Sequence, residues 1–236
     1  MISFFTTQPL AEGSELALGE DAVGHARARR VEPGDAARLL DGQGTIATGQ
    51  LVAIEKRRLL VRVDDVTKVP RPPGLEVLVP IADKDRMLLA AEKCAELQVT
   101  AWQPVFYARS RSVNPRGEGP RFREKVEARM RAALEQSGGA WLPAIGEDAE
   151  FDTAVRAVEQ ARTRIILDSR GTSLAGHIDK QDIILAVGPE GGLTDDELGA
   201  AHDLGWRTAA LAHTVLRFET AVIAAVGTVR ALQYGR

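Results

Sequence analysis

The chain has 236 residues, of which 44% are hydrophobic and 27% charged, and its formal net charge at pH 7 is −3. This composition allows one large or two modest domains with full cores and excludes wholesale disorder. No basic region precedes a long apolar stretch at the N-terminus, and no run of about eighteen apolar residues occurs. We therefore expect a soluble, cytoplasmic protein without a signal peptide or a membrane-spanning segment.

The first seventy residues are β-rich. Residues 45–54 and 58–66 predict the two strands of a hairpin in a small barrel. Residues 42–47, GQGTIA, match the loose dinucleotide pattern G-x-G-x-x-A. Strand-like sequence follows them instead of a helix, so we interpret this stretch as a turn without a cofactor.

Residues 69–74, Val-Pro-Arg-Pro-Pro-Gly, predict a linker, because proline and glycine disfavour the interiors of helices and strands. We place the boundary there, between domains 1–70 and 71–236. The second domain begins with a strand-like run at 75–82 and a helix-like run at 85–98.

The helix-like run at 85–98 contains the single cysteine, Cys94, which has no partner for an internal disulfide. Its small apolar neighbours favour a buried hydrophobe over a nucleophile. No Cys/His cluster has the spacing of a zinc site, so we expect no metal.

Charge is unevenly distributed in the second domain. Residues 105–131 contain eight basic and three acidic side chains, Arg111 among the former, whereas residues 182–203 contain six acids and no Lys or Arg. The first segment suits phosphate groups. A charged stretch is more often a solvated helix face than a binding site, so this pattern permits an RNA partner without requiring one.

Two short stretches near the C-terminus mark the predicted site. Residues 188–198, GPEGGLTDDEL, follow a compact apolar run at 182–187 that predicts a buried strand. Residues 216–221, LRFETA, lead into a second helix that is expected to begin at Glu219. Ligands bind at C-terminal strand ends in open α/β sheets, and glycines allow close backbone approach. A tight turn without a ligand is the alternative. The glycines are not followed by the Lys-Ser or Lys-Thr pair of a P-loop, which argues against a nucleoside triphosphate as ligand.

The segments after the glycine stretch alternate between helix and strand. Thr194 and Glu197 predict a capping box, and the helix is expected to end at Gly205. Residues 207–212 predict a strand. The last helix, 219–232, has no polar face, so it must be covered all round by the core or by a second subunit.

GPEGGLTDDEL followed by VLRFETA resembles the signature pair of the 16S ribosomal RNA uridine-N3 methyltransferases, which belong to the SPOUT, or α/β-knot, superfamily. That family's second motif is Leu-Arg-Thr-Glu-Thr-Ala, and this chain has Phe218 at the first Thr. The resemblance implies an α/β methyltransferase domain with a parallel sheet and a trefoil knot, preceded by a PUA-like β-barrel that binds RNA. It also implies S-adenosylmethionine as cofactor, no metal, 16S ribosomal RNA in the small ribosomal subunit as substrate, and a homodimer.

The resemblance extends to residues that are expected to face the RNA. In the first domain it covers His25, Arg27 and Arg30, whose planar guanidinium groups suit phosphate or base contacts. In the second domain it covers Arg109, Ser110, Gln136 and Ser137. The chain departs from the family pattern at Ser3, Arg29, Gln98, Val126, Gly139 and Ala212. Gln98 replaces a helix-ending Gly, which predicts a looser helix end there.

The resemblance assigns the cofactor to backbone and side-chain groups of one C-terminal set: Leu167, Val187, Gly188, Pro189, Glu190, Gly191, Gly192, Leu211, Leu216, Arg217, Glu219 and Thr220. Methyl transfer to uridine N3 needs positioning and removal of the N3 proton. Glu219 and Glu96 are the candidate proton acceptors, although Glu219 is also suited to the N-terminus of its helix.

Arg217 is a candidate for orienting the uracil carbonyl or the cofactor carboxylate, with a structural salt bridge as the alternative. Phe218 is expected to lie against the cofactor or the target base. Two other functions stay open from sequence: a knotted methyltransferase acting on transfer RNA or on a ribose hydroxyl, and a non-catalytic RNA-binding protein.

Overall fold

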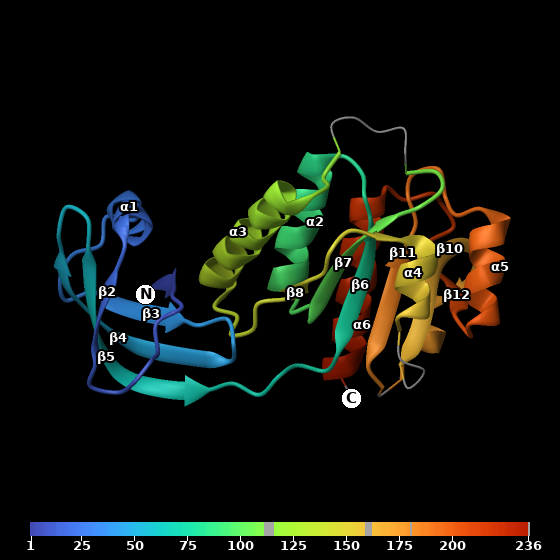
Figure 1. Ribbon diagram of the computed structural model, residues 1–236. Helices are drawn as coiled ribbons and strands as arrows, with labels where there is room; N and C mark the ends of the chain where they lie inside the picture. Colours follow the sequence, from blue (N-terminus) through green and yellow to red (C-terminus); the bar gives the residue numbers. More distant parts are fainter. Residues whose placement is uncertain (111–115, 159–161, 180, 236) are drawn as a thin grey trace. The chain divides into compact units, whose positions relative to one another are not determined.

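The computed structural model describes residues 1–110, 116–158, 162–179 and 181–235, and the chain folds into two compact units (Figure 1). The first unit comprises residues 1–71 and 131–142, and the second comprises residues 72–130 and 143–236. Residues 131–142 therefore group with the N-terminal unit, although they follow the proline-rich linker in sequence. No helix of the described residues is long and apolar enough to cross a membrane.

The first unit is a five-stranded sheet with one whole helix and the last turns of another, which begins in the second unit. Its elements are β1 (Ile2–Phe5), β2 (Glu15–Leu18), α1 (Glu20–Ala28), β3 (Ala36–Leu40), β4 (Thr45–Ile54) and β5 (Leu59–Lys68). The strand order is β1-β3-β4-β5-β2, and only the β1–β3 pair is parallel. The predicted hairpin is confirmed as the antiparallel pair β4 and β5.

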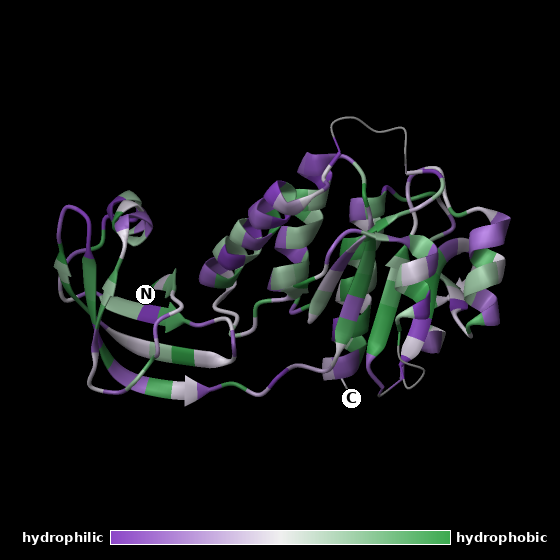
Figure 2. Cartoon of the chain, viewed as in Figure 1, coloured by the Kyte–Doolittle hydropathy of each residue, from purple (hydrophilic) through white to green (hydrophobic). Residues whose placement is uncertain are grey.

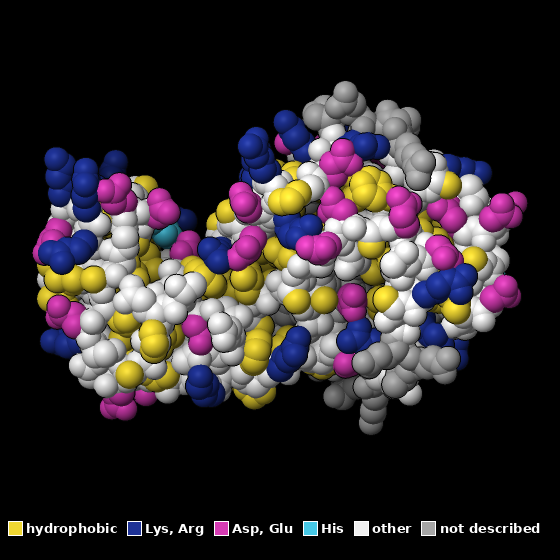
Figure 3. Space-filling view, viewed as in Figure 1, with side chains coloured by type: hydrophobic (Ala, Val, Ile, Leu, Met, Phe, Trp, Pro, Cys, Tyr) yellow, Lys and Arg dark blue, Asp and Glu magenta, His cyan; other side chains and the backbone are white. Residues whose placement is uncertain are grey.

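Alternation along β5 explains how this sheet forms its core. Leu59, Val61 and Val63 are buried, whereas Arg62 and Asp64 between and beyond them are exposed. The turn at 42–44 enters β4 directly, with positive φ at both of its glycines, so its interpretation as a turn is confirmed. Figure 3 shows Lys and Arg side chains over α1 and the turn between β4 and β5.

The second unit is an α/β domain with a parallel sheet, as predicted. Its elements are β6 (Leu75–Pro80), α2 (Lys84–Glu96), β7 (Ala101–Phe106), α3 (Pro120–Ser137), whose last turns belong to the first unit, β8 (Ala144–Ile145), β9 (Ala149–Glu150), α4 (Phe151–Arg156), β10 (Thr163–Ser173), η1 (Leu174–His177), β11 (Ile183–Val187), α5 (Asp195–Asp203), β12 (Arg207–Ala210) and α6 (Phe218–Tyr234). The sheet order is β12-β10-β11-β6-β7-β8, with β9 also pairing with β7. All pairs in it are parallel.

The central strands of this sheet are apolar on both faces. Every residue of β11 is buried, and Figure 2 shows β6 and β11 largely in the hydrophobic colour. This continuous apolar character is typical of parallel strands covered by helices on both sides.

Local signals around α5 are borne out in detail. The Thr194 hydroxyl accepts a hydrogen bond from the Glu197 N–H at 3.2 Å, and Glu197 Oε2 accepts one from the Thr194 N–H at 2.8 Å. The helix stops before Gly205, whose φ of 79° is readily adopted only by glycine. The capping box and the helix end are both confirmed.

Helix α6 differs from the expectation in one respect. Its buried face packs within the second unit, but Thr220, Ala224 and Ala231 on the opposite face are exposed. A single chain therefore does not cover this helix all round. Cys94 is fully buried in α2 as predicted, and burial raises the pKa of its thiol.

The end of α2 is closed by a buried arginine. Gln98 takes the left-handed conformation with a φ of 59°, the conformation that a glycine would adopt there. The Arg230 guanidinium, on a residue that is 4% exposed, donates to the carbonyls of Leu97 and Gln98 and to that of Pro73. The helix therefore ends firmly despite the missing glycine.

Arg230→Met is expected to lower the free energy of unfolding by about 3 kcal/mol, because it leaves three partly buried carbonyl acceptors without their charged donor. Urea denaturation of the full chain measures this change. Arg207→Met, at an exposed position of β12, is the matched control and is expected to change stability by less than about 0.5 kcal/mol. Equal losses of stability in the two variants would contradict the role of Arg230 at the end of α2.

Candidate functional site

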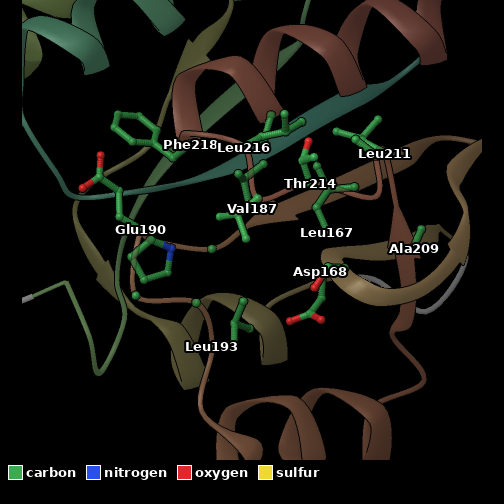
Figure 4. Close-up of a pocket in the computed structure, with 18 residues that line it drawn as sticks. Leu167, Asp168, Val187, Glu190, Leu193, Ala209, Leu211, Thr214, Leu216 and Phe218 are labelled. Atoms are coloured by element: carbon green, nitrogen blue, oxygen red, sulfur yellow. The ribbon is translucent and has the colours of Figure 1, made fainter.

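A pocket of about 280 Å³ opens where strands β10, β11 and β12 end at their carboxyl edge (Figure 4). This is the edge at which ligands bind in open α/β sheets. Three segments build it: the end of β10, the glycine stretch after β11, and the segment from β12 into α6. It is lined by Leu167, Asp168, Ser169, Val187, Gly188, Pro189, Glu190, Gly191, Gly192, Leu193, Ala209, Leu211, Ala212, Thr214, Val215, Leu216, Phe218 and Ala221.

The two sequence motifs therefore meet in one cavity. Figure 4 shows Leu167, Val187 and Thr214 at its centre, with Phe218 on one side and Leu211 on the other. Phe218 is 2% exposed, so its ring forms part of the wall at the position where a Thr is usual in the resembled family. An apolar wall next to the backbone of the glycine stretch suits a flat heterocycle.

The glycine stretch is held in shape by an arginine from a distant strand. The Gly192 N–H donates to the Pro189 carbonyl at 2.8 Å, and Gly192 has a φ of 68°. Arg109, just beyond β7, donates from Nη1 to the Gly191 carbonyl at 2.7 Å and to the Leu193 carbonyl at 3.3 Å. A Cβ on Gly191 would lie 3.1 Å from Arg109 Cβ, so a larger residue there would require Arg109 to shift by a few tenths of an ångström.

A charged cluster flanks the pocket at the start of α6. Arg86 of α2 contacts Glu190 through Nη1, and its Nε lies 3.9 Å from Glu219 Oε1. Glu219 is buried, and within the described structure its Oε2 has no hydrogen-bond partner. A buried carboxylate oxygen without a donor is costly, so it marks a place where a ligand group would be favoured.

Asp168 is a pocket residue that the sequence analysis missed. It directly follows Leu167 at a register shift in β10, and Arg170 holds it through Nε to Oδ1 at 2.9 Å and Nη2 to Oδ2 at 3.0 Å. Its place after an apolar strand-like run was the signal that could have identified it. Hydrogen bonds from the Arg170 side chain hold the pKa of the Asp168 carboxyl below its ordinary value.

Asp168→Asn is expected to lower the free energy of unfolding by about 1 kcal/mol at pH 7, a value kept small because Arg170 is largely exposed. A depressed pKa in the folded state stabilises the fold above the unfolded pKa and loses this effect as the pH falls through the folded value. The difference between variant and wild type should therefore shrink below about pH 4. Denaturation at several pH values measures it, and a difference independent of pH would contradict the pairing.

Several predicted residues lie outside the pocket. The pocket lining includes none of Arg217, Glu219 and Thr220 at the start of α6. Arg217 and Thr220 are exposed, whereas Glu219 is buried. Glu96 is at the far end of α2, ten residues from Arg86 and hence about 15 Å along the helix, where it is paired with Lys93 at 2.7 Å. The structure therefore does not bring Glu96 to the site, and it speaks against Glu96 as the proton acceptor.

The predicted RNA contacts of the second unit also need correction. Ser110 is 2% exposed, and its Oγ accepts a hydrogen bond from the Tyr107 N–H, so it is not available to RNA. Arg109 supports the glycine stretch. In the basic segment, Arg123 pairs with Glu147 and Arg129 pairs with Glu92. Arg111 lies outside the described residues.

The predicted RNA contacts of the first unit lie partly together. His25 and Gln136 line one cavity, and His25 Nδ1 is 3.7 Å from Glu135 Oε2. Arg27 donates to the Glu55 carbonyl, and Arg30 takes a φ of 55° after α1. The Ser137 hydroxyl accepts from the Gly139 N–H at 3.3 Å. Arg27, Arg30 and Ser137 do not line this cavity.

Among the described residues, no group of three or more His, Cys, Asp or Glu side chains could hold a metal ion.

Comparison with known proteins agrees with this geometry. The family model of the RNA methyltransferase domain matches residues 70–230, and that of the RNA methyltransferase PUA domain matches residues 18–64. The chain is 30% identical to the ribosomal RNA small subunit methyltransferase E of Synechocystis over 87% of this chain and 69% of that protein. The protein of the same name from Mycobacterium bovis is 28% identical, over 98% of this chain and 92% of the relative.

The structure is also similar to the crystal structure of a ribosomal RNA small subunit methyltransferase E from Neisseria gonorrhoeae bound to S-adenosylmethionine, with a TM-score of 0.88. The identity is 29%, and the match covers 98% of each chain. These findings confirm the predicted PUA-like N-terminal domain and the methyltransferase domain after it. The chain therefore belongs to the RNA methyltransferase family.

Proposed function

We propose that the protein transfers a methyl group from S-adenosylmethionine to N3 of a uridine in 16S ribosomal RNA, within the small ribosomal subunit. The observation that carries the proposal is the junction of both C-terminal motifs in one pocket at the carboxyl edge of β10, β11 and β12. The names of the relatives and the bound S-adenosylmethionine of the Neisseria structure support the reaction and the substrate.

The residues present fit the cofactor. Leu167, Val187 and Leu211 offer an apolar wall for an adenine, and the backbone of the glycine stretch offers hydrogen bonds to its edge. Asp168, kept ionised by Arg170, is suited to accept from ribose hydroxyls. When bound, S-adenosylmethionine supplies an electrophilic methyl group on a sulfonium.

The chain itself has to orient the uracil and accept its N3 proton. Glu219 is the proposed acceptor, because its carboxylate is buried beside the pocket and Oε2 has no partner within the described structure. Arg86, between Glu190 and Glu219, is suited to fix that carboxylate. Arg217 and Thr220 border the pocket in sequence and are proposed to contact the cofactor or the RNA after binding. The work of the enzyme is then mainly positioning and proton transfer.

Mass spectrometry of ribosomal RNA nucleosides from a deletion strain tests the proposal. Loss of N3-methyluridine from the small subunit is expected. Retention of this nucleoside, with loss of a methylated ribose or of a transfer RNA modification, would favour the alternative of a methyltransferase with another RNA target. Because the substrate is ribosomal, we also propose that the protein acts in the cytoplasm. The proposal further includes a sequence division into domains 1–70 and 71–236 and a trefoil knot in the second domain.

We further propose that α6 joins two copies of the chain. Thr220, Ala224 and Ala231 form an exposed, uncharged stripe on this helix, and the nearby Val215 is 87% exposed. Small residues allow close approach, so this stripe is suited to packing against a helix of a second copy. A second copy would also complete the coverage that the helix lacks in one chain.

Ala224→Glu is expected to convert a dimer into a monomer, because it places a charge in the centre of the proposed interface. Sedimentation velocity at several protein concentrations measures the change. Ala28→Glu, at an exposed position of α1, is the control and should leave the dimer intact. A wild-type chain that sediments as a monomer at all concentrations would contradict the proposal.

A further inference from the structure

The first unit contains a cavity of about 740 Å³ that the proposed methyl transfer does not use. Its lining combines cationic, acidic and small side chains from four elements of that unit. The residues that matter here are Ser3, His25, Arg29, Arg38, Glu135 and Gln136.

Local structure places two arginines on this cavity. Arg29 follows His25 by one helical turn, and its N–H donates to the His25 carbonyl at 3.1 Å, so both side chains lie on the same face of α1. Arg38 lies on β3 between the buried Ala37 and Leu39, and it therefore points away from the core. Ser3 of β1 is its neighbour in the parallel register, and its small side chain leaves the space open.

Neither guanidinium is neutralised. Within the described structure, the side chains of Arg29 and Arg38 have no ion pair or hydrogen bond. Arg38 Nη1 lies against the backbone of Gly138, where a Cβ would come within 2.3 Å of it. Two partly free guanidinium groups on one cavity are a site for a phosphate group.

An oriented carboxylate faces the same space. Glu135 Oε1 accepts the Phe5 N–H at 2.7 Å, and Oε2 lies 3.7 Å from His25 Nδ1. The His25 ring is in turn held edge-on to Phe4, with 5.5 Å between ring centroids. A carboxylate has about four acceptor positions, so both oxygens of Glu135 keep the capacity to accept from a ligand.

We infer that this cavity binds one nucleotide of single-stranded RNA, with its phosphate on Arg29 and Arg38 and a guanine base edge on Glu135. Guanine is the base whose Watson–Crick edge presents two adjacent donors, N1–H and N2–H, to the two oxygens of one carboxylate. Single-stranded RNA is read through such exposed edges. The inference rests on the proposed function, because it gives the N-terminal unit a sequence preference for the RNA that the second unit methylates.

The inference uses residues that the sequence motifs only partly indicated. His25 and Gln136 were expected to contact RNA, whereas Arg38 and Glu135 were not singled out. Arg29 stands where the resembled family usually has Leu, so this part of the cavity departs from the family pattern.

Binding of fluorescently labelled RNA trinucleotides UGU, UAU, UCU and UUU to the full chain tests the inference by anisotropy. The wild type is expected to prefer UGU by about tenfold or more over the other three. Arg38→Gln is expected to weaken all four by about tenfold and to reduce the slope of log K against log salt by about 0.7, the loss of one phosphate contact. Glu135→Gln can still accept from the Phe5 N–H, and it is expected to remove the preference for UGU while leaving UUU binding unchanged.

Arg58→Gln, an exposed arginine at the turn before β5 that does not line the cavity, is the matched control. Thermal unfolding of each variant identifies any that does not fold. Equal affinity for all four trinucleotides in the wild type would overturn the guanine assignment, and equal weakening by Arg38→Gln and Arg58→Gln would overturn the cavity as the phosphate site. Competition by inorganic phosphate alone, without any effect of the base, would also overturn it.

The failure of this inference is distinguishable from the failure of the proposed function. Methylation of isolated small subunits by a wild type that shows no trinucleotide preference would leave the enzyme in place and remove the guanine site. A clear preference for UGU in a chain that methylates no ribosomal RNA would support the site and remove the proposed reaction.

Discussion

Gly192→Val is expected to weaken the binding of S-adenosylmethionine by about 100-fold or more. The backbone of Gly192 has a φ of 68°, which a β-branched residue adopts only at a cost of about 1–3 kcal/mol. The residue also lines the pocket, so relaxation of the strain would move the glycine stretch itself. About 2.7 kcal/mol corresponds to a 100-fold change in affinity. Isothermal titration calorimetry on the full chain measures it.

Two further variants separate this effect from general loss of structure. Gly199→Ala changes an exposed glycine inside α5 with no atom within 4 Å of the added Cβ. It is expected to raise stability by about 0.5–1 kcal/mol and to leave cofactor binding unchanged. Asparagine adopts positive φ more readily than valine, so Gly192→Asn should lose less affinity for S-adenosylmethionine than Gly192→Val. If Gly192→Val bound the cofactor as the wild type does, the pocket would not be the cofactor site.

Glu219→Gln is expected to lower the rate of methyl transfer by about 10²–10⁴-fold, the usual contribution of a positioned general base. The substitution preserves the shape of a side chain that is only 10% exposed, so the fold should be retained. What it removes is the capacity to take up a proton beside the pocket. Single-turnover methylation of isolated small subunits with labelled S-adenosylmethionine measures the rate.

Glu96→Gln is the paired measurement, because sequence alone made both glutamates candidates. Glu96 is paired with Lys93 at the end of α2 that is far from Arg86, so the rate of methyl transfer in Glu96→Gln is expected to stay within about twofold of the wild type. A full rate in Glu219→Gln together with a slow Glu96→Gln would reverse the assignment. A slow rate that follows only from weaker cofactor binding would instead make Glu219 a binding residue, which calorimetry distinguishes.

Sequence predicted the parts of the fold that depend on neighbouring residues. Apolar alternation identified the β4–β5 hairpin, and the pair Thr194 and Glu197 identified the start of α5, because strand pleating and helix capping are local effects. The glycine stretch marked the site for the same reason. The family resemblance then supplied Leu167 and Leu211, which no spacing rule would have connected to the glycines.

Features that depend on distant contacts could not be predicted. Asp168 lies at the register shift in the pairing of β10 with β12, and that shift is a property of the assembled sheet. The burial of Ser110 and the exposed stripe on α6 likewise depend on which elements pack together. Residues 131–142 belong to the first unit although their sequence gives no sign of it.

The link between Arg109 and Gly191 bears on how this protein can change during evolution. The carbonyl that the arginine holds comes from a residue 82 positions later, and a Cβ at that residue would lie only 3.1 Å from Arg109 Cβ. A substitution at either position is therefore expected to disturb the bend that both residues maintain. Across related proteins, a replacement of the arginine should be inherited together with a compensating change beside the glycine, and an alignment deep enough to detect covariation would reveal the two positions as a coupled pair.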